Sequence, residues 1–551
     1  AKSLRNSIRS EVRHGRPRLT GNLWYALATT LIDGDGSQKA IEEAFSNAIR
    51  ALGRSKHTLD SRLQVLQHKY VWLWETQQYR AALQTLDKAE RLTHQERLAI
   101  DRIRIIDQKG VSLQELGRDD EALAAHRQAL RLARRKHHDD CTETSLNNLG
   151  VVYRKLNKPQ AAAKVFREAR ALARKQEDLA SECSAANNLA LALIDMGSLA
   201  GARQILLKVS RESAKSGLHG ECAWALDELA SLDVYAGKHE AAEKRYHQAF
   251  SRARRSGNGE IISRVALNRA SLLSHVGKPD DALRLLESVE AEASHLPHAS
   301  QYFQHLAVSC EEVGDPEKAE DAWLAAEQAA MRVGRKENLA EIGIGVACAR
   351  VAQRKFSMAD RAFADACSHA SDTRERLTCH IAYMEALLHA RRWKAAERVF
   401  EKARSLTLRH KLVDVYVALH SVLGDYCWED SARRRFEGSK AFVAAMAKAI
   451  EIGLEEYISV GTKLFVHLML VDRPERAKVI HHLRKRLLLW LNRQEGAADD
   501  DALIRTMLWP FRLAEICPFE LSSFEDLSHR QIEAFFGTEI QRILTSHGRS
   551  S

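Results

Sequence analysis

The densest run of potential metal ligands is His137-His138-Asp139-Asp140-Cys141, in which five consecutive side chains could each bind a metal ion. Consecutive residues cannot all converge on one ion, and no matching ligand pair recurs elsewhere in the chain. The sequence also lacks the GxxxxGK loop that binds phosphates, the HExxH zinc motif and the GxSxG nucleophile motif. We therefore predict a protein that is not an enzyme and that carries no metal and no cofactor.

A second set of chemically capable side chains forms two polar columns that recur about every 40 residues. One column reads Gln108, Asn148, Asn188, Glu228, Asn268 and His305, and the column just before it reads Asp107, Asn147, Asn187, Asp227, Leu267 and Gln304. Such a run of polar residues at one register position is not typical of a core. Side-chain amides both donate and accept hydrogen bonds, so stacked Asn residues can bind the backbone of an extended peptide. Glu228 departs from the amide pattern and indicates a local preference for a cationic group.

The columns are positioned by a repeat that runs through most of the chain. An alanine returns in steps of 40 residues, with two steps of 37, at Ala82, Ala122, Ala162, Ala202, Ala242, Ala282, Ala319, Ala359 and Ala396. A bulky residue follows four positions later in most copies, although His126 is an exception, and a second small residue follows after seven. Offsets of 0, 4 and 7 lie on one face of an α-helix. With a second apolar stripe and a polar break upstream, each unit is predicted to be helix A, a tight turn and helix B.

This pattern resembles the tetratricopeptide repeat. The copy at residues 140–179 has Leu149-Gly150, Tyr153, Ala162, Phe166 and Ala169 in the signature order of that family. The resemblance covers residues 60–410, and the LNNLG and NNLA segments are most similar to kinesin light chain and its bacterial relatives. It implies an all-α, right-handed superhelical solenoid of about ten to eleven helical hairpins with a C-terminal helical cap.

The resemblance also implies where a partner would bind, because the A helices line the concave face of such solenoids. In kinesin-light-chain-like and co-chaperone members, Asn at the matching place contacts bound peptide, and this role passes to Asn148, Asn188 and, by extension, Asn268. An inter-repeat ladder that ties adjacent A helices is the alternative, and both roles can coexist. The candidate binding residues are Asn147, Asn148, Asn187, Asn188, Asp227, Glu228, Asn268, Arg104, Arg154, Trp224, Tyr235 and Arg264.

Three of these candidates have a second interpretation. Trp224 is expected either to anchor a ligand, as exposed indoles often do, or to pack between neighbouring A helices. Arg154 and Arg264 could each hold a ligand carboxylate or phosphate, or be solvated or paired within the chain.

The chain is basic, with 83 Lys and Arg against 73 Asp and Glu, a net charge of +10 and a pI near 9.1. Many basic residues fall on B helices and the loops after them, where they also complement the helix dipole, so binding to nucleic acid is an alternative only. The Gly-Arg-Pro core of an AT-hook at residues 15–17 could equally be part of a solvated arm. The nine cysteines form no CxxC pair, and no stretch reaches the roughly 18 apolar residues of a membrane helix. We expect a cytoplasmic location.

The organisation predicted from the sequence has five parts. They are a basic N-terminal arm (1–20), a degenerate first repeat (21–59), nine repeats of 37–40 residues (60–415), a degenerate repeat with an insertion (416–455) and capping helices (456–551). In the degenerate repeat at 416–455, Ala441 and Ala445 are expected in the stripe, with Lys448 at the second small position. Within the cap, the basic amphipathic segment 479–491 is expected to cover the last repeat, a membrane-surface helix being the alternative.

These observations favour a scaffold or sensor that recognises a protein or peptide in its concave groove, in a regulatory, stress or defence system. One alternative is the ligand-sensing C-terminal arm of a larger regulator, which would suit a chain that begins at Ala1 rather than Met, as processing also would. The second alternative is a basic nucleic-acid scaffold. No membrane partner is expected.

Overall fold

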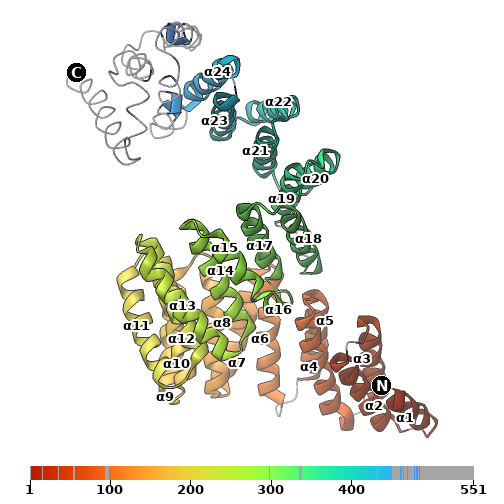
Figure 1. The fold of residues 1–551 in the computed structure, drawn as a ribbon. Coiled ribbons are helices and arrows are strands. Elements are labelled where there is room, and N and C mark those ends of the chain that lie inside the picture. Colours follow the sequence, from red (N-terminus) through yellow and green to blue (C-terminus); the bar gives the residue numbers. More distant parts are fainter. Residues whose placement is uncertain are drawn as a thin grey trace. The chain divides into compact units, whose positions relative to one another are not determined.

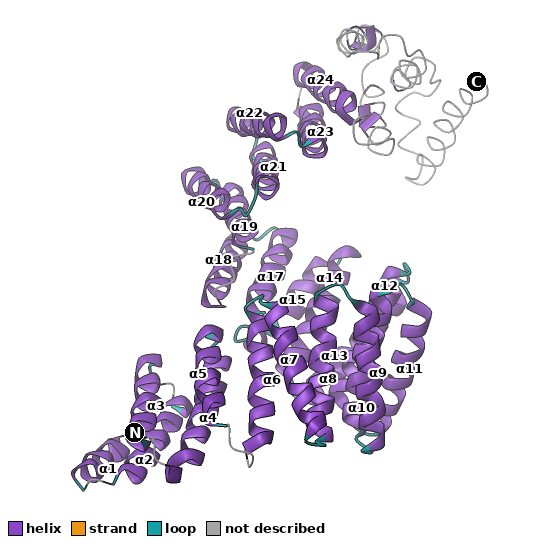
Figure 2. Cartoon of the chain, turned by 180° about the vertical axis from the view of Figure 1, so that it is seen from behind, coloured by secondary structure: helices purple, strands orange, loops and turns teal. Residues whose placement is uncertain are grey.

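The computed structural model describes residues 2–449, except 15, 35, 54–55, 94–97, 297, 334–337 and 431, and a few single positions beyond 449. Every regular element in the described part of the chain is a helix, which confirms the all-α prediction (Figures 1 and 2). The chain divides into two compact units, residues 1–335 and 336–551. Most of the predicted cap, including most of segment 479–491, lies outside the described residues, and the residue limits of the five predicted parts stay predictions.

The first unit begins with helix α1 (Lys2–Arg13), which lies in the predicted arm and buries Ile8. Helical hairpins follow: α2 (Pro17–Asp33) with α3 (Gln38–Leu52), α4 (Leu59–Glu75) with α5 (Tyr79–Leu92), α6 (Ala99–Glu115) with α7 (Asp119–Arg135), α8 (Asp139–Lys155) with α9 (Pro159–Lys175), α10 (Leu179–Asp195) with α11 (Leu199–Lys215), α12 (His219–Tyr235) with α13 (His239–Ser256), α14 (Gly259–His275) with α15 (Pro279–Glu287) and α16 (Glu290–Ala293), and α17 (Ala299–Val313) with α18 (Pro316–Val333). A short 3₁₀ turn, η1 (Lys56–Thr58), precedes α4.

The second unit contains three described hairpins. They are α19 (Leu339–Ala352) with α20 (Phe356–His369), α21 (Thr373–His389) with α22 (Trp393–His410), and α23 (Val413–Asp430) with α24 (Ala432–Ala449). None of the helices in the described part of the chain is long and apolar enough to cross a membrane.

The turns inside several hairpins follow from residues visible in the sequence. Gly237, between α12 and α13, has φ +69°, a left-handed conformation that costs glycine little. Asn157 takes the same place between α8 and α9 with φ +54°, and asparagine tolerates this conformation better than most residues. Pro159 then starts α9, where its missing N–H would have no helical partner in any case. The chain therefore reverses within a few residues, which lays helix B against helix A.

The periodic alanines mark the interface between these helices. All nine alanines of the sequence register are 0% exposed, so the predicted small–large–small stripe is confirmed as a packing face. The signature glycine shows how tight the contact is, because a Cβ on Gly150 would lie 2.4 Å from Cε1 of Phe166. Small residues on one helix thus admit the bulky residue of the next, as ridges-into-grooves packing requires.

The last described repeat follows the same rule with a shifted stripe. Phe442 is fully buried, and its ring would lie 2.7 Å from a Cβ on Gly424, as Phe166 does with Gly150. Phe442 is therefore the bulky residue and Ala445 the second small one. Ala441 and Ala445 are both buried, as the sequence predicts, and the contact with Gly424 adds Phe442, which the sequence analysis did not name, as the bulky residue of α24.

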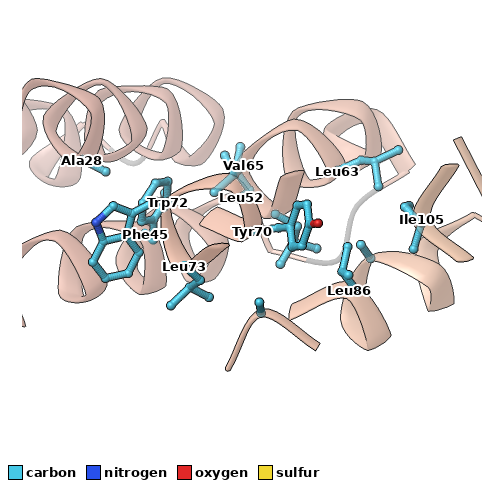
Figure 3. Close-up of a cluster of buried hydrophobic side chains, with 14 of the residues drawn as sticks. Ala28, Phe45, Leu52, Leu63, Val65, Tyr70, Trp72, Leu73, Leu86 and Ile105 are labelled. Carbon is cyan, nitrogen blue, oxygen red and sulfur yellow. The ribbon is translucent and has the colours of Figure 1, made fainter. Parts of the chain in front are cut away.

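The first hairpins share a core in which aromatic residues pack together with the buried alanines. The rings of Phe45 and Trp72 pack in a tilted arrangement with their centroids 5.9 Å apart, and Tyr70, Leu86 and Ile105 extend this cluster toward α6 (Figure 3).

A long-range hydrogen bond joins two distant segments of the first unit's hairpin series. Nε2 of Gln77, in the α4–α5 turn, donates to the carbonyl oxygen of His295, which follows α16, at 3.2 Å. The two residues are 218 positions apart in the sequence, so the hairpins between them follow a curve that brings these two segments into contact.

Candidate binding surface on helices α8, α10, α12 and α14

The two polar columns lie on the A helices but differ in exposure. Asp107, Asn187 and Asp227 of the first column are buried, although Asn147 of that column is half-buried, whereas Asn148, Asn188, Glu228 and Asn268 of the second are all half-buried. Adjacent residues on a helix point about 100° apart, so one column faces into the packing and the other reaches its edge. The second column is consequently the one that a ligand can reach.

Several amides are already used inside the protein. Nδ2 of Asn187 on α10 donates to the carbonyl oxygen of Glu221 on α12 at 3.3 Å. Nδ2 of Asn268 on α14 donates to both carboxylate oxygens of Asp227 on α12, at 3.1 Å each. Asn147 instead donates to Glu143 within α8 at 2.9 Å. Asn187 and Asn268 therefore make the inter-repeat ladder that was the alternative to peptide binding.

Asn148 on α8 and Asn188 on α10 behave differently. Within the part of the chain that the structure describes, neither side chain makes a hydrogen bond, although both are half-buried. Each amide has two N–H donors and a carbonyl acceptor available. These are the two residues to which the family resemblance gave the peptide-binding role, and their hydrogen-bonding capacity is free.

Asp227 is the buried centre of a small network on α12 and α14. Its Oδ2 lies 3.3 Å from Nε of Arg264, whose guanidinium lies over the ring of Trp224 at 4.5 Å from the centroid. Burial raises the pKa of Asp227, while Arg264 and the hydrogen bond from Asn268 oppose that rise. Asp227 is 0% exposed, so it supports the surface and cannot touch a ligand itself. Trp224 remains half-buried with Arg264 stacked on it.

Glu228, the neighbour of Asp227, has no such partner. Its half-buried carboxyl makes no hydrogen bond or ion pair with any described residue. Burial raises the pKa of Glu228 to about 7, and the charges of Asp227 and Asp195 add to this rise, while Arg264 and Arg154 oppose it. Because Arg154 is on α8, Asp195 on α10 and Arg264 on α14, charged groups from three other A helices act on this one carboxyl.

Arg154 is paired within the chain rather than free. Its Nε and Nη2 donate to the two carboxylate oxygens of Asp195 at 2.6 and 3.2 Å, which joins α8 to α10. The two side chains are 27% and 32% exposed, so the pair lies at the surface. Asp195 was not among the candidates from the sequence. The available signal was its register, 41 residues after Arg154 and one repeat further on.

The last two candidates lie elsewhere on the first unit. Arg104 on α6 is exposed and acts electrostatically on the Cys141 thiol, whose pKa is raised chiefly by burial. Tyr235, at the end of α12, is 79% exposed and lines a shallow cavity of about 390 Å³ with Leu199 and Arg203. Because α11 supplies part of this cavity, Tyr235 belongs to the hairpin end rather than to the group around Glu228.

Two motifs noted in the sequence have structural roles. Nδ1 of His138 accepts a hydrogen bond from the backbone N–H of Cys141 at 3.2 Å and so caps α8. His126 is fully buried, with Nδ1 2.7 Å from Asp107, which also accepts from Oγ of Ser145 at 2.5 Å. Asp107 therefore joins three helices. Among the described residues, no group of three or more His, Cys, Asp or Glu is placed to hold a metal ion.

Much of the positive charge on the B helices is also paired. Arg134 on α7 pairs with Glu168 on α9, and Arg254 on α13 pairs with Glu292 on α16. Arg170 on α9 lies 3.3 Å from Glu182 on α10. These pairs join neighbouring helices and reduce the charge available to a phosphate backbone.

Comparison with known proteins supports the repeat assignment. Residues 101–175 and 183–211 match family models described as tetratricopeptide repeat, and residues 228–294 match anaphase-promoting complex subunit 5. No curated protein gave a match.

Three solved structures illustrate the similarity. BtubC (BKLC) from P. vanneervenii is 22% identical, over 38% of this chain and 89% of that one, with a TM-score of 0.33. The apo quorum sensor NprR from B. thuringiensis is 13% identical, over 66% and 99% of the two chains, with a TM-score of 0.39. A Rap protein complexed with Competence and Sporulation Factor is 13% identical, over 64% and 99%, with a TM-score of 0.38. The kinesin-light-chain-like subtype stays a prediction. The repeat register, the paired helices and the two repeat-family matches show that the chain contains tetratricopeptide repeats, at residues 101–175 and 183–211, within an all-α solenoid fold.

Proposed function

We propose that this chain is a non-enzymatic recognition module that binds a protein or peptide across α8, α10, α12 and α14. The observation that carries the proposal is the pair of unused amides on adjacent A helices, Asn148 and Asn188, both half-buried. Polar groups that are partly withdrawn from water and unbonded gain most from a new hydrogen-bond partner. An extended peptide backbone offers alternating donors and acceptors that suit such a row.

The residues around these amides favour the binding of a protein or peptide over catalysis. Trp224, half-buried beside Arg264, offers the aromatic contact that is common at the energetic centre of interfaces. The ion pair between Arg154 and Asp195 holds α8 and α10 in register, so the surface is organised before a ligand arrives. We place the module in a cytoplasmic regulatory, stress or defence system, with the effector of such a system carried by a partner or by another part of a larger protein.

Affinity capture combined with cross-linking mass spectrometry tests the proposal. The triple variant Asn148→Ala/Asn188→Ala/Trp224→Ala is compared with wild type and with a matched variant, Gln160→Ala/Lys164→Ala, on the exposed face of α9. Circular dichroism verifies that each variant is folded. We expect cross-links from partner to α8–α14 in wild type and in the α9 variant, and their loss in the triple variant. If the folded triple variant retains the same partners and cross-links, the surface has been assigned wrongly.

The nucleic-acid alternative is tested separately by a mobility-shift titration over salt. Because many B-helix arginines are engaged in ion pairs, we expect at most weak binding that disappears as salt rises. Tight binding that persists at physiological salt would favour the nucleic-acid scaffold instead.

A further inference from the structure

We propose that Glu228 receives a Lys or Arg side chain of the bound peptide, so that the surface on α8–α14 selects ligands with a cationic residue at one defined position. This inference rests on the proposed function and adds the chemistry of the ligand. Two observations support it: the excess of negative over positive side chains around Glu228, and the ion pairs that the neighbouring carboxylates already make with arginines.

Three carboxylates and two guanidinium groups meet around this point. Asp195 accepts hydrogen bonds from Nε and Nη2 of Arg154. Asp227 forms an ion pair with Arg264 and accepts a hydrogen bond from the amide of Asn268. Glu228 is the carboxylate of this group for which the described residues provide no partner. A single positive charge from outside would therefore complete the set of ion pairs.

The environment of Glu228 makes such a pair stronger than one on an open surface. Its carboxyl is half-buried, so an arriving ammonium or guanidinium group interacts with it through a medium less polar than water. A charged hydrogen bond formed there also satisfies a group that otherwise lacks a partner. An acidic ligand side chain at this place would instead face Asp195 and Glu228 together, which are the carboxylates closest to solvent in the group.

The repeat fixes where the cationic residue lies in the peptide. Glu228 on α12, Asn188 on α10 and Asn148 on α8 occupy the same register position one repeat apart. Neighbouring helix axes lie about 8–10 Å apart, and an extended chain advances about 3.3 Å per residue. The cationic residue is thus about three residues from the backbone group that bonds Asn188, and about six from the one that bonds Asn148.

Binding is expected to depend on pH through the same carboxyl. Four charged groups face Glu228: Asp227 on its own helix, Arg154 on α8, Asp195 on α10 and Arg264 on α14. With a pKa of about 7, Glu228 is largely protonated at pH 5.5 and must lose its proton to pair with a cation. Affinity for a cationic peptide should therefore fall as pH drops below 7, by up to about tenfold per pH unit.

The test uses two peptide pools and the full chain. Both pools are acetylated and amidated nonapeptides with randomised flanks, one with Lys and the other with Glu at the central position. Retention on immobilised protein is measured by mass spectrometry for wild type, for Glu228→Gln and for Glu240→Gln, which removes an exposed carboxylate on α13. We expect wild type and Glu240→Gln to retain the Lys pool about tenfold more than the Glu pool at pH 8, and Glu228→Gln to lose that preference.

The outcomes separate this inference from the proposed function. Equal retention of both pools, or a Lys preference unchanged in Glu228→Gln, overturns the cationic assignment while peptide binding stands. Retention of neither pool overturns both. A Lys preference that weakens at pH 5.5 in wild type, but not in Glu228→Gln, supports the carboxyl as its source.

Discussion

Replacing Glu228 by glutamine is expected to stabilise the folded chain at pH 8 and to change its stability little at pH 5. Burial raises the pKa of Glu228 to about 7 from an ordinary value of 4.5. The folded chain therefore binds this proton more tightly than the unfolded chain does. Between pH 4.5 and 7 the ionised carboxylate costs the folded state free energy, and stability is lost as pH rises through that window. Glutamine has nearly the same shape and never ionises, so it escapes this loss.

The size of the effect follows from the two pKa values. At 1.36 kcal/mol per pKa unit, the difference corresponds to about 3 kcal/mol at pH 8 as an upper bound. Glu228 is half-buried, and solvent screening reduces the penalty, so we expect a gain of about 1–2 kcal/mol at pH 8 and less than about 1 kcal/mol at pH 5.

Urea denaturation at pH 5 and pH 8, followed by circular dichroism, measures this difference. Hydrogen–deuterium exchange of the α12 amides localises it, because repeat proteins can unfold in segments. Glu240→Gln is the control, since its exposed carboxylate should give the same small change at both pH values. A loss of stability in Glu228→Gln at pH 8, or an equal change at both pH values, would refute the assignment of Glu228 as a half-buried carboxyl without an ion-pair partner among the described residues.

Three further substitutions test the packing, each by urea or thermal unfolding. Gly150→Ala places a methyl group 2.4 Å from the ring of Phe166 and should cost about 1–3 kcal/mol; a neutral result would mean that the two helices are less tightly packed than described. His126→Phe supplies the apolar residue usual at this register but leaves buried Asp107 without its imidazole partner, so a loss of about 1–3 kcal/mol is expected, and a gain would contradict it. Asn268→Asp replaces an amide donor by a second carboxylate against a buried one, which should destabilise the chain by about 2–3 kcal/mol at pH 8 and less at pH 5, and a pH-independent effect would argue against that contact.

The hairpin architecture was predictable from the sequence because its cause is local. A small–large–small stripe at offsets 0, 4 and 7 lies on one helix face whatever surrounds it, and all nine register alanines are indeed buried. In α24 the sequence named Ala441 and Ala445, which are buried, but it did not identify Phe442 as the bulky residue. The phase of that helix is set by the contact of Phe442 with Gly424, which no single helix reveals.

The recognition surface was only partly predictable. The sequence placed polar columns on the A helices and separated Glu228 from the amides, since those facts depend on register alone. The sequence could not show that Asn268 donates its amide hydrogen bonds to Asp227 while Asn188 makes none to a described residue. Nor could it show that Arg154 pairs with Asp195. These outcomes depend on side chains about one repeat apart meeting across curved, stacked helices. The periodicity of the sequence therefore determined which residues lie on the same face of the solenoid. Only the tertiary packing of neighbouring repeats decided which of those residues keep hydrogen-bonding groups available for a ligand.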